Sequence, residues 1–431
     1  CSLPEAAGHV AAISLSVQGG TLAPVDAEHR PVRPAILWND RRCTAQREAY
    51  LQTFGGAESM YQKTGWPLGN GLNANQIRWM RDNEPERFAR TDRFLSVPDY
   101  LTLKMTGIAA VDFSNAGINQ LADIRRGAYD PDLLGFAGVT EEQLARIVPA
   151  GQVIGRLSDS AAAELGLTTN CVVVSGVHDQ YAAALGAGAK DAGDILIGSG
   201  TAWVVAAISD EPNFTHGLAQ SIAAAPGKWG SLWSLSSGGA CLEWWRKSLC
   251  RGSNGQAVAY DRINEETAGR RAAEDGLFFF PPSGHSMPGE TFRKASLVGL
   301  ELSHDCYDVA RAVMEGVVFQ TVWTLESFRS GRKRDSLIFA GGASKSDVWA
   351  QMTADAANCP IRIPEVADLT CVGAAILAGT GCGIFTTVEE GYQKLRVGER
   401  VLRPDVSRAE RYAAHLSEYK RIAEILGRAV P

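Results

Sequence analysis

The sequence predicts an α/β protein with two domains. Segments with the apolar, β-branched pattern of strands alternate with segments of helical periodicity in both halves of the chain. The length of 431 residues exceeds what one hydrophobic core usually covers. Three strand patterns, within 171–180, 194–201 and 336–343, run directly into a carboxylate or a glycine turn. Ligands of open α/β sheets gather beyond the carboxyl ends of strands, so these three junctions are candidate site segments.

Composition excludes several classes of protein. The hydrophobic content of 45% and the charged content of 21% are typical of a globular protein. The net charge of −6 disfavours nucleic acid as a partner. No run reaches the ~18 apolar residues of a membrane span. Nine cysteines without a C-x-x-C pair favour reduced thiols, hence a cytoplasmic location, over a disulfide framework or a zinc site.

The elements of the first half follow in order from local patterns. Alternating or β-branched runs predict strands, and an apolar residue every three or four positions predicts helices. The strands are expected at 9–17, 22–25, 34–40, near 153 and at 171–178, and the helices at 41–60, 72–90, within 153–167 and at 182–189. The last of these helices is rich in small residues, which favours close packing.

The second half begins after a polar, turn-rich stretch at 190–194. We therefore divide the chain into domains 1–188 and 189–431. Strands are expected at 194–207, 231–235, 277–280 and 336–340, and helices after 239, at 307–329, 348–358 and 369–383, and over the last ~25 residues. The helix at 369–383 is rich in alanine and glycine, and it should also pack tightly.

The three strand junctions together favour phosphoryl transfer from a nucleotide to a hydroxyl. Asp179 stands where a general base is useful, although a carboxylate there can also cap the next helix. Backbone N–H groups of the turn Gly198-Ser-Gly200-Thr201 can cradle a phosphate, although many hairpin turns look the same. Gly341-Gly342-Ala343 lets a ligand lie flat on backbone, and its alternative is a plain strand-to-helix turn.

Longer motifs add a resemblance to a known family. Ala295-Ser-Leu-Val-Gly-Leu300, seven residues, and then Asp308-Val-Ala-Arg-Ala-Val-Met-Glu315 match the C-terminal signature of the FGGY family of carbohydrate kinases. Pro34-Ala-Ile-Leu-Trp-Asn-Asp40 is similar to the xylulokinase version of the N-terminal segment. The resemblance implies two actin-like (ribonuclease-H-like) domains flanking a deep cleft, with a sugar on the first domain and MgATP mainly on the second.

The resemblance also assigns roles to individual residues. It implies Asp179 as the base, ATP and Mg²⁺ as cofactors, and no residue dedicated to the metal. The residues implied for the sugar are Gln18, Trp38, Asp40, Asp112, Phe113 and Gln180. Those implied for the nucleotide are Gly200, Thr201, Gly239, Gly342, Ala343 and Ser346. The alternatives are packing for Trp38 and Phe113, and turn or helix capping for Asp40 and Asp112. His178, a neighbour of Asp179 on a strand end, is expected to point away from it.

Two departures from the family pattern bear on activity and substrate. An Asp-x-Gly-Thr hairpin should precede residue 1, so we expect the sequence to come from a longer gene, with a degenerate paralogue as the alternative. A protein beginning at Cys1 is then expected to be poorly soluble and inactive. Xylulokinases usually carry Gln-Met-His-Gly where this chain has Gln18-Gly-Gly-Thr21, while 111–116 and Asp179-Gln180 are closer to glycerol kinase.

The leading hypothesis is an ATP-dependent kinase of a small ketose or polyol, with D-xylulose as the first candidate. Glycerol, erythritol-like polyols and ribulose are the alternatives. A catalytically degenerate sugar- and nucleotide-binding regulator and an actin-like structural ATPase are the rival classes. The expected partners are a small-molecule substrate and, as one option, a second copy in a homodimer, with no nucleic acid and no membrane.

Overall fold

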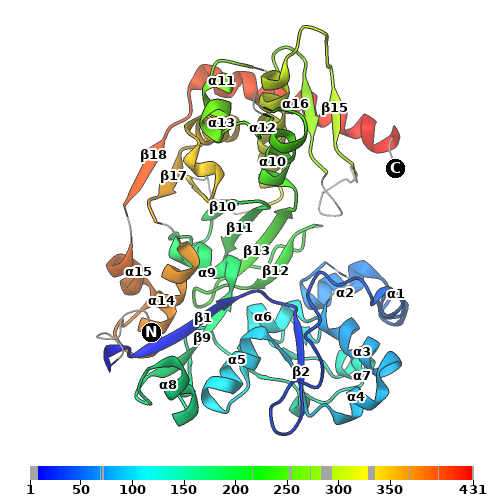
Figure 1. Ribbon diagram of the computed structural model, residues 1–431, viewed down its shortest axis with the longest axis vertical. Helices are drawn as coiled ribbons and strands as arrows, with labels where there is room; N and C mark the ends of the chain where they lie inside the picture. Colours follow the sequence, from blue (N-terminus) through cyan, green and yellow to red (C-terminus); the bar gives the residue numbers. More distant parts are fainter. Residues whose placement is uncertain are drawn as a thin grey trace.

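The computed structural model describes residues 8–429 except 68, 70–71, 216, 252–254, 272, 283–293, 329–334, 367 and 397. Figure 1 shows two lobes: helices α1 to α8 lie in one, α10 to α13 and α16 lie in the other, and α9 lies where they meet. The mixture of helices and sheets confirms the predicted α/β class. Among the described residues, no helix is both long enough and apolar enough to cross a membrane.

The described part of the first half builds a three-stranded mixed sheet, three separate strand pairs and the helices around them. Its strands are β1 (Ala12–Val17), β2 (Leu22–Val25), β3 (Arg93–Ser96), β4 (Ala110–Asp112), β5 (Ala122–Asp123), β6 (Ala128–Tyr129), β7 (Arg146–Val148), β8 (Val153–Arg156) and β9 (Val172–His178). Its helices are α1 (Thr44–Thr53), α2 (Ala57–Thr64), α3 (Asn73–Asn83), α4 (Pro85–Arg90), α5 (Val97–Thr106), α6 (Phe113–Ile118), α7 (Pro131–Ala137), α8 (Asp159–Leu165) and α9 (Asp179–Gly186). In the described part, β1 pairs in parallel with β9, and β9 pairs antiparallel with β8.

Three expected elements of this half differ from the structure. The segment 34–40 is not a strand, because Pro34 has no N–H to donate and only Ile36 forms a bridge, to Leu22. The helix expected at 41–60 is broken by Gly55 and Gly56, whose φ angles are 78° and 101°. The helix expected at 72–90 ends before Pro85, which instead begins α4 at its first turn.

The second half is built on a larger sheet. Its strands are β10 (Ile195–Ser199), β11 (Trp203–Ser209), β12 (Ala219–Ile222), β13 (Trp229–Leu235), β14 (Phe278–Phe280), β15 (Ser296–Val298), β16 (Leu337–Ala340), β17 (Ile361–Pro364) and β18 (Glu399–Leu402). Its helices are α10 (Gly238–Ser248), α11 (Tyr260–Thr267), α12 (Cys306–Leu325), α13 (Asp347–Ala357), α14 (Leu369–Gly381), α15 (Val388–Leu395) and α16 (Val406–Ala429). Among the described residues, the large sheet has the order β12-β13-β11-β10-β16-β17-β18, and β14 pairs with β15 in a separate hairpin-like pair.

The two halves share a hydrophobic cluster around α9. Val177 and Tyr181 of the first half pack with Leu196, Ile376 and Leu377 of the second half, and all five are buried. Helix α14 contacts α9, β1 and β9, although it follows α9 and β9 by almost 200 positions in sequence and β1 by more than 350 (Figure 1). Residues of both halves therefore pack around the junction of β9 and α9, where Asp179 lies.

Candidate active site

A bulge in the small sheet sets the end of β9. The register of β1 against β9 shifts between Ser14 and Ser16, next to Gly176. A Cβ atom on Gly176 would lie 1.7 Å from the carbonyl oxygen of Leu15, so only glycine allows this approach. After the bulge, β9 ends at His178 and α9 begins with Asp179. Asp179 thus lies in the first turn of a helix, where the helix dipole favours a negative charge.

His178 contacts Asp179, and the expectation that it points away is wrong. The Nδ1 atom of His178 lies 3.2 Å from the Oδ1 atom of Asp179. The reason is that His178 is the N-cap of α9, so the chain leaves the strand geometry there and its Nδ1 accepts the backbone N–H of Gln180 at 3.4 Å. Burial lowers the pKa of His178, against the opposing effect of the Asp179 charge. The ring is therefore neutral near pH 7, with its lone pair on Nδ1.

The carboxylate of Asp179 keeps one free oxygen. Its side chain is 36% exposed, yet its Oδ1 atom is buried and has no hydrogen-bond partner among the described residues. A buried carboxylate oxygen without a donor costs free energy unless another group, such as a substrate hydroxyl, supplies one.

A second polar chain positions the backbone of His178. Its N–H donates to the Oγ of Ser114 at 2.9 Å, and the Ser114 hydroxyl in turn donates to Asp112. Asp112 also accepts the backbone N–H of Ser114 and the Nδ2 group of Asn115, each at 2.7 Å. The Asp112 carboxylate is buried, which raises its pKa, and it caps α6. This arrangement favours the capping interpretation of Asp112 over direct contact with a sugar.

The other residues expected at the sugar lie in different surroundings. Gln18 is exposed and donates to Thr21 at 3.2 Å, and Trp38 is 52% exposed with its backbone N–H donating to the same Thr21. Both side chains are therefore accessible to a ligand. Asp40 accepts three hydrogen bonds from Arg42, which lowers the pKa of Asp40. Phe113 is 5% exposed and packs in the core of the first half, while Gln180 is half-buried beside Asp179.

The sequence reasoning overlooked Trp66, which lies after α2. Its ring centroid is 6.0 Å from that of His178. Its indole N–H is buried and has no acceptor among the described residues. A buried indole normally has a partner, so this N–H is a free donor on a ring that lies close to His178. No local motif marks this tryptophan, because its importance depends on packing against a distant strand.

All six residues expected at the nucleotide line one cavity of about 810 Å³ in the second half. Gly200 and Thr201 lie in the turn after β10, Gly239 in the first turn of α10, and the others after β16. The cavity is also lined by Ser199, Ala240, Leu242, Glu243, Tyr260, Asp261, Asn264, Lys345 and Trp349. Four separate segments, 199–201, 239–243, 260–264 and 342–349, thus converge on one space large enough for a nucleotide.

Three glycines lie at or beside this cavity, and the physical role of the missing side chain differs among Gly239, Gly341 and Gly342. A Cβ atom on Gly239 would lie 2.4 Å from the carbonyl oxygen of Gly200, because α10 begins directly against that turn. Gly341 has a φ of 109°, and a Cβ there would lie 2.9 Å from backbone of Ser199. A Cβ on Gly342 would meet only the Ser199 oxygen at 3.7 Å. Gly342 is therefore not required by the fold, and its missing side chain keeps cavity space open.

The described residues contain no group of three His, Cys, Asp or Glu side chains that could hold a metal ion. Mg²⁺ in phosphoryl-transfer sites is often bound by one or two carboxylates together with the phosphates of the nucleotide. The free Oδ1 atom of Asp179 fits such a sparse set of ligands, in which the phosphates supply the rest.

Comparison with known proteins shows similarity over almost the whole chain. Residues 5–186 match the N-terminal domain of the FGGY family of carbohydrate kinases, and residues 195–382 match its C-terminal domain. The chain is 30% identical to the L-xylulose/3-keto-L-gulonate kinase of Escherichia coli (strain K12), over 97% of this chain and 83% of that protein. It is 26% identical to the xylulose kinase of Bacillus subtilis (strain 168), over 95% of this chain and 82% of that protein.

A solved structure supports the same fold. The xylulose kinase from Rhodospirillum rubrum superposes with a TM-score of 0.86 at 26% sequence identity, covering 96% of this chain and 84% of that chain. The strand junctions described above thus belong to a two-domain kinase architecture.

Proposed function

Because this chain belongs to the FGGY family of carbohydrate kinases, we propose that it phosphorylates a terminal hydroxyl of a small ketose or polyol, with D-xylulose as the first candidate. The protein is an ATP-dependent carbohydrate kinase of the xylulokinase type. One observation carries the proposal: Asp179 begins α9 with a buried oxygen that has no hydrogen-bond partner among the described residues. A substrate hydroxyl is the group that this oxygen lacks.

The reaction requires that the substrate hydroxyl be positioned against the γ-phosphate and that one group accept its proton. The terminal hydroxyl oxygen attacks the γ-phosphorus of ATP, a new O–P bond forms, and the bond to the ADP oxygen breaks. The hydroxyl proton passes to Asp179 as the new bond forms. Asp179 stands in the first turn of α9, beside the positive end of the helix dipole.

His178 supports Asp179 by its position. In the neutral ring, Nδ1 accepts the backbone N–H of Gln180, and the Oδ1 atom of Asp179 lies 3.2 Å away. The ring therefore fixes the start of α9, where Asp179 stands. His178 is thus a positioning residue, and Ser114 holds its backbone.

The sugar is held by the accessible polar and aromatic side chains around Asp179. Gln18 and Gln180 supply amides for hydroxyls, and the exposed ring of Trp38 offers a face for C–H groups. The free indole N–H of Trp66 is an added donor. Asp40 and Asp112 are occupied by protein donors, so we propose that they shape the site and leave direct contacts to the other residues. Phe113 contributes packing beneath the site.

ATP occupies the cavity between β10, α10 and β16. Backbone N–H groups of the Gly200-Thr201 turn face the phosphates, and Gly239, Gly342, Ala343 and Ser346 surround the adenosine. The Asp179 carboxylate would help to hold magnesium, which would neutralise charge on the nucleotide phosphates. The division into 1–188 for the sugar and 189–431 for the nucleotide, the cytoplasmic location and a homodimer are parts of the same proposal.

The proposed identity of the substrate is based on the sugars for which the relatives are named. Proteins named for xylulose and for L-xylulose align with this chain at 26% and 30% identity, so both ketopentoses are candidates. The pair Gly19-Gly20 removes the two side chains that xylulokinases usually place here. The structure fills this space differently, since a Cβ on Gly19 would lie 2.8 Å from Ile118 and 3.1 Å from His178.

The test is an ADP-release assay of the purified kinase with D-xylulose, L-xylulose, D-ribulose, glycerol and erythritol. The proposal predicts the highest kcat/KM with a ketopentose, D-xylulose first. Higher kcat/KM with glycerol or erythritol would overturn the ketose assignment. Asp179→Asn serves as the control for contaminating kinases, because it should release no substrate-dependent ADP above a small residual level.

A further inference from the structure

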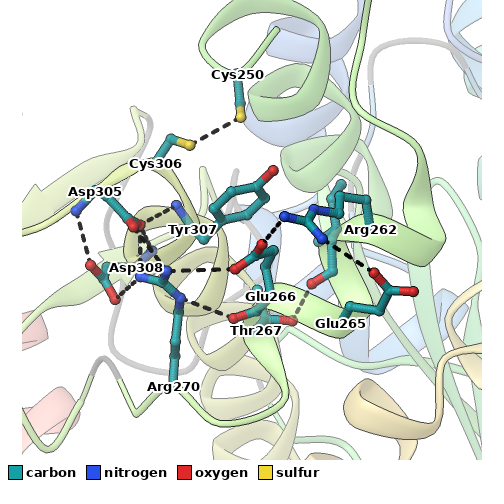
Figure 2. Close-up of polar contacts among 11 residues, drawn as sticks. Cys250, Arg262, Glu265, Glu266, Thr267, Arg270, Asp305, Cys306, Tyr307 and Asp308 are labelled. Carbon is teal, nitrogen blue, oxygen red and sulfur yellow. Dashed lines mark hydrogen bonds and ion pairs between the residues drawn. The ribbon is translucent and has the colours of Figure 1, made fainter. Parts of the chain in front are cut away.

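Two cysteines of the second half lie unusually close to each other. The Sγ atoms of Cys250 and Cys306 are 3.1 Å apart, although the residues are separated by 56 positions in sequence. Figure 2 shows the two side chains pointing toward each other, Cys250 from the segment after α10 and Cys306 from the start of α12. A disulfide bond is about 2.05 Å long, so closure requires a movement of about 1 Å. Cys171 and Cys382, in contrast, donate to the backbone carbonyls of Val172 and Gly379.

The position of Cys306 is fixed by the start of α12. Cys306 is the first residue of that helix, and Asp305 caps it by accepting the backbone N–H groups of Tyr307 and Asp308. Arg270 binds Asp305 through both terminal nitrogens, at 2.7 and 2.8 Å, and Asp308 at 2.6 Å (Figure 2). This network anchors the backbone on both sides of the sulfur.

The position of Cys250 is fixed by the end of α10. Its backbone N–H donates to the carbonyl oxygen of Trp245 at 3.1 Å, as does that of Leu249 at 2.9 Å. Trp245 is fully buried, and its ring centroid lies 6.2 Å from that of Tyr307. The ends of α10 and α12 are therefore packed together, and the two sulfurs meet because the backbones bring them there.

We propose that Cys250 and Cys306 form a reversible disulfide, made by hydrogen peroxide and broken by small thiols. The pair is a modification site independent of the kinase reaction, and it ties the helix that opens on the nucleotide cavity to α12. Gly239 lines the cavity at one end of α10, and Cys250 follows the other end. The bond would close a loop that includes α11, β14 and β15.

Disulfide formation by peroxide takes two steps, and the exposure of the two sulfurs decides which cysteine reacts first. Cys306 is partly exposed and Cys250 is 5% exposed. Burial and the neighbouring Cys306 raise the pKa of Cys250 to about 12, so it remains a thiol near pH 7. Cys306 therefore attacks the peroxide first, giving a sulfenic acid and one water. The Cys250 sulfur then attacks the Cys306 sulfur, its proton leaves with the hydroxyl as a second water, and the two thiols have lost two electrons to the peroxide.

The experiment uses the whole protein, reduced, freed of reductant and treated with a small excess of hydrogen peroxide. Free thiols are alkylated and the protein is digested with trypsin without reduction. The expected product is peptide 248–251 joined to peptide 295–311, lighter by two hydrogen atoms than their sum and absent after dithiothreitol treatment. The oxidised protein should melt on the order of 5 °C higher than the reduced protein, because the bond restricts the unfolded chain.

Cys250→Ser and Cys306→Ser should each abolish both the joined peptide and the rise in melting temperature. Cys241→Ser is the matched control, a buried cysteine on the same α10 helix, and it should change neither result. Separate alkylation of Cys250 and Cys306 after peroxide would overturn the proposal, and so would a joined peptide that persists after dithiothreitol treatment. The wild-type protein alone decides the first point, even if a serine variant folds poorly.

Discussion

Replacing Gly342 with valine tests the nucleotide cavity without breaking the fold. Gly342 has helical backbone angles, φ −63° and ψ −43°, and a Cβ there meets only one atom within 4 Å, at 3.7 Å. The added methyl groups therefore project into the cavity instead of into protein. We expect ATP to bind more weakly and the sugar to bind as before.

The magnitude follows from the contact that the ligand loses. A displaced adenosine that loses about 100 Å² of apolar contact with this wall loses about 2.5 kcal/mol, at about 25 cal/mol per Å². This corresponds to a roughly 60-fold higher KM for ATP. The melting temperature should change by only a degree or two, since surface substitutions without strain are usually within about 0.5 kcal/mol.

Initial rates of ADP release over a range of ATP concentrations, and calorimetry with ATP and with sugar, measure the effect. Gly269→Val is the matched control, because Gly269 is also exposed, has no atom within 4 Å of an added Cβ and lies outside this cavity. If Gly342→Val left ATP affinity unchanged, adenosine would not lie against this wall. If it weakened the sugar and ATP equally, the effect would be on the fold and the reasoning would fail.

Three further predictions concern the base and its support. Asp179→Asn should lower kcat by ~10²-fold or more while calorimetric ATP affinity is retained, and near-normal turnover would remove Asp179 from the mechanism. Ser114→Ala should lower kcat by about 10-fold with little change in the KM for ATP, because the buried N–H of His178 loses its acceptor; equal losses in both parameters would indicate a merely structural role. Burial lowers the pKa of His178 below its ordinary 6.5, so the unfolded chain binds more protons as pH falls below about 6.5 and stability is lost on acidification. Melting temperatures between pH 7 and 5 should therefore fall less steeply in His178→Asn than in wild type, with the exposed His9→Asn as control, and parallel curves would contradict the neutral ring.

Local patterns predicted the strand junctions, because each consists of a continuous run of residues. The strand before Asp179, the turn at Gly200-Thr201 and the turn after β16 are all present. The convergence of the two glycine turns on one cavity depends on the order of strands in the large sheet, which pairs β10 with both β11 and β16. Single segments carry no signal for such pairing, and the family resemblance supplied it. The roles of the site residues stay predictions.

Each incorrect or missed prediction has a specific physical cause. The direction of His178 was wrong because alternation along a strand was extended one residue too far, to the position where α9 is already capped. The prediction of a strand at 34–40 was wrong because the apolar run was given more weight than the missing N–H of Pro34. Trp66 was overlooked because its neighbour His178 is more than 100 positions away in sequence. Contacts of this kind follow from tertiary packing, which no window of sequence contains.

The small residues of α9 and α14 show how the two halves act on the same carboxylate. A Cβ on Gly186 would lie 2.0 Å from the carbonyl oxygen of Leu369, and a Cβ on Gly373 would lie 2.0 Å from that of Ala182. The contact is reciprocal, glycine against backbone in both directions, so the two helices cannot slide apart or rotate without losing it. Both helices were predicted to pack closely, but not against each other. Helix α9 carries Asp179 and belongs by sequence to the first half, while α14 belongs to the second. A boundary near residue 188 therefore cuts through a close contact, because the helix that begins with the proposed base is packed against a helix of the second half.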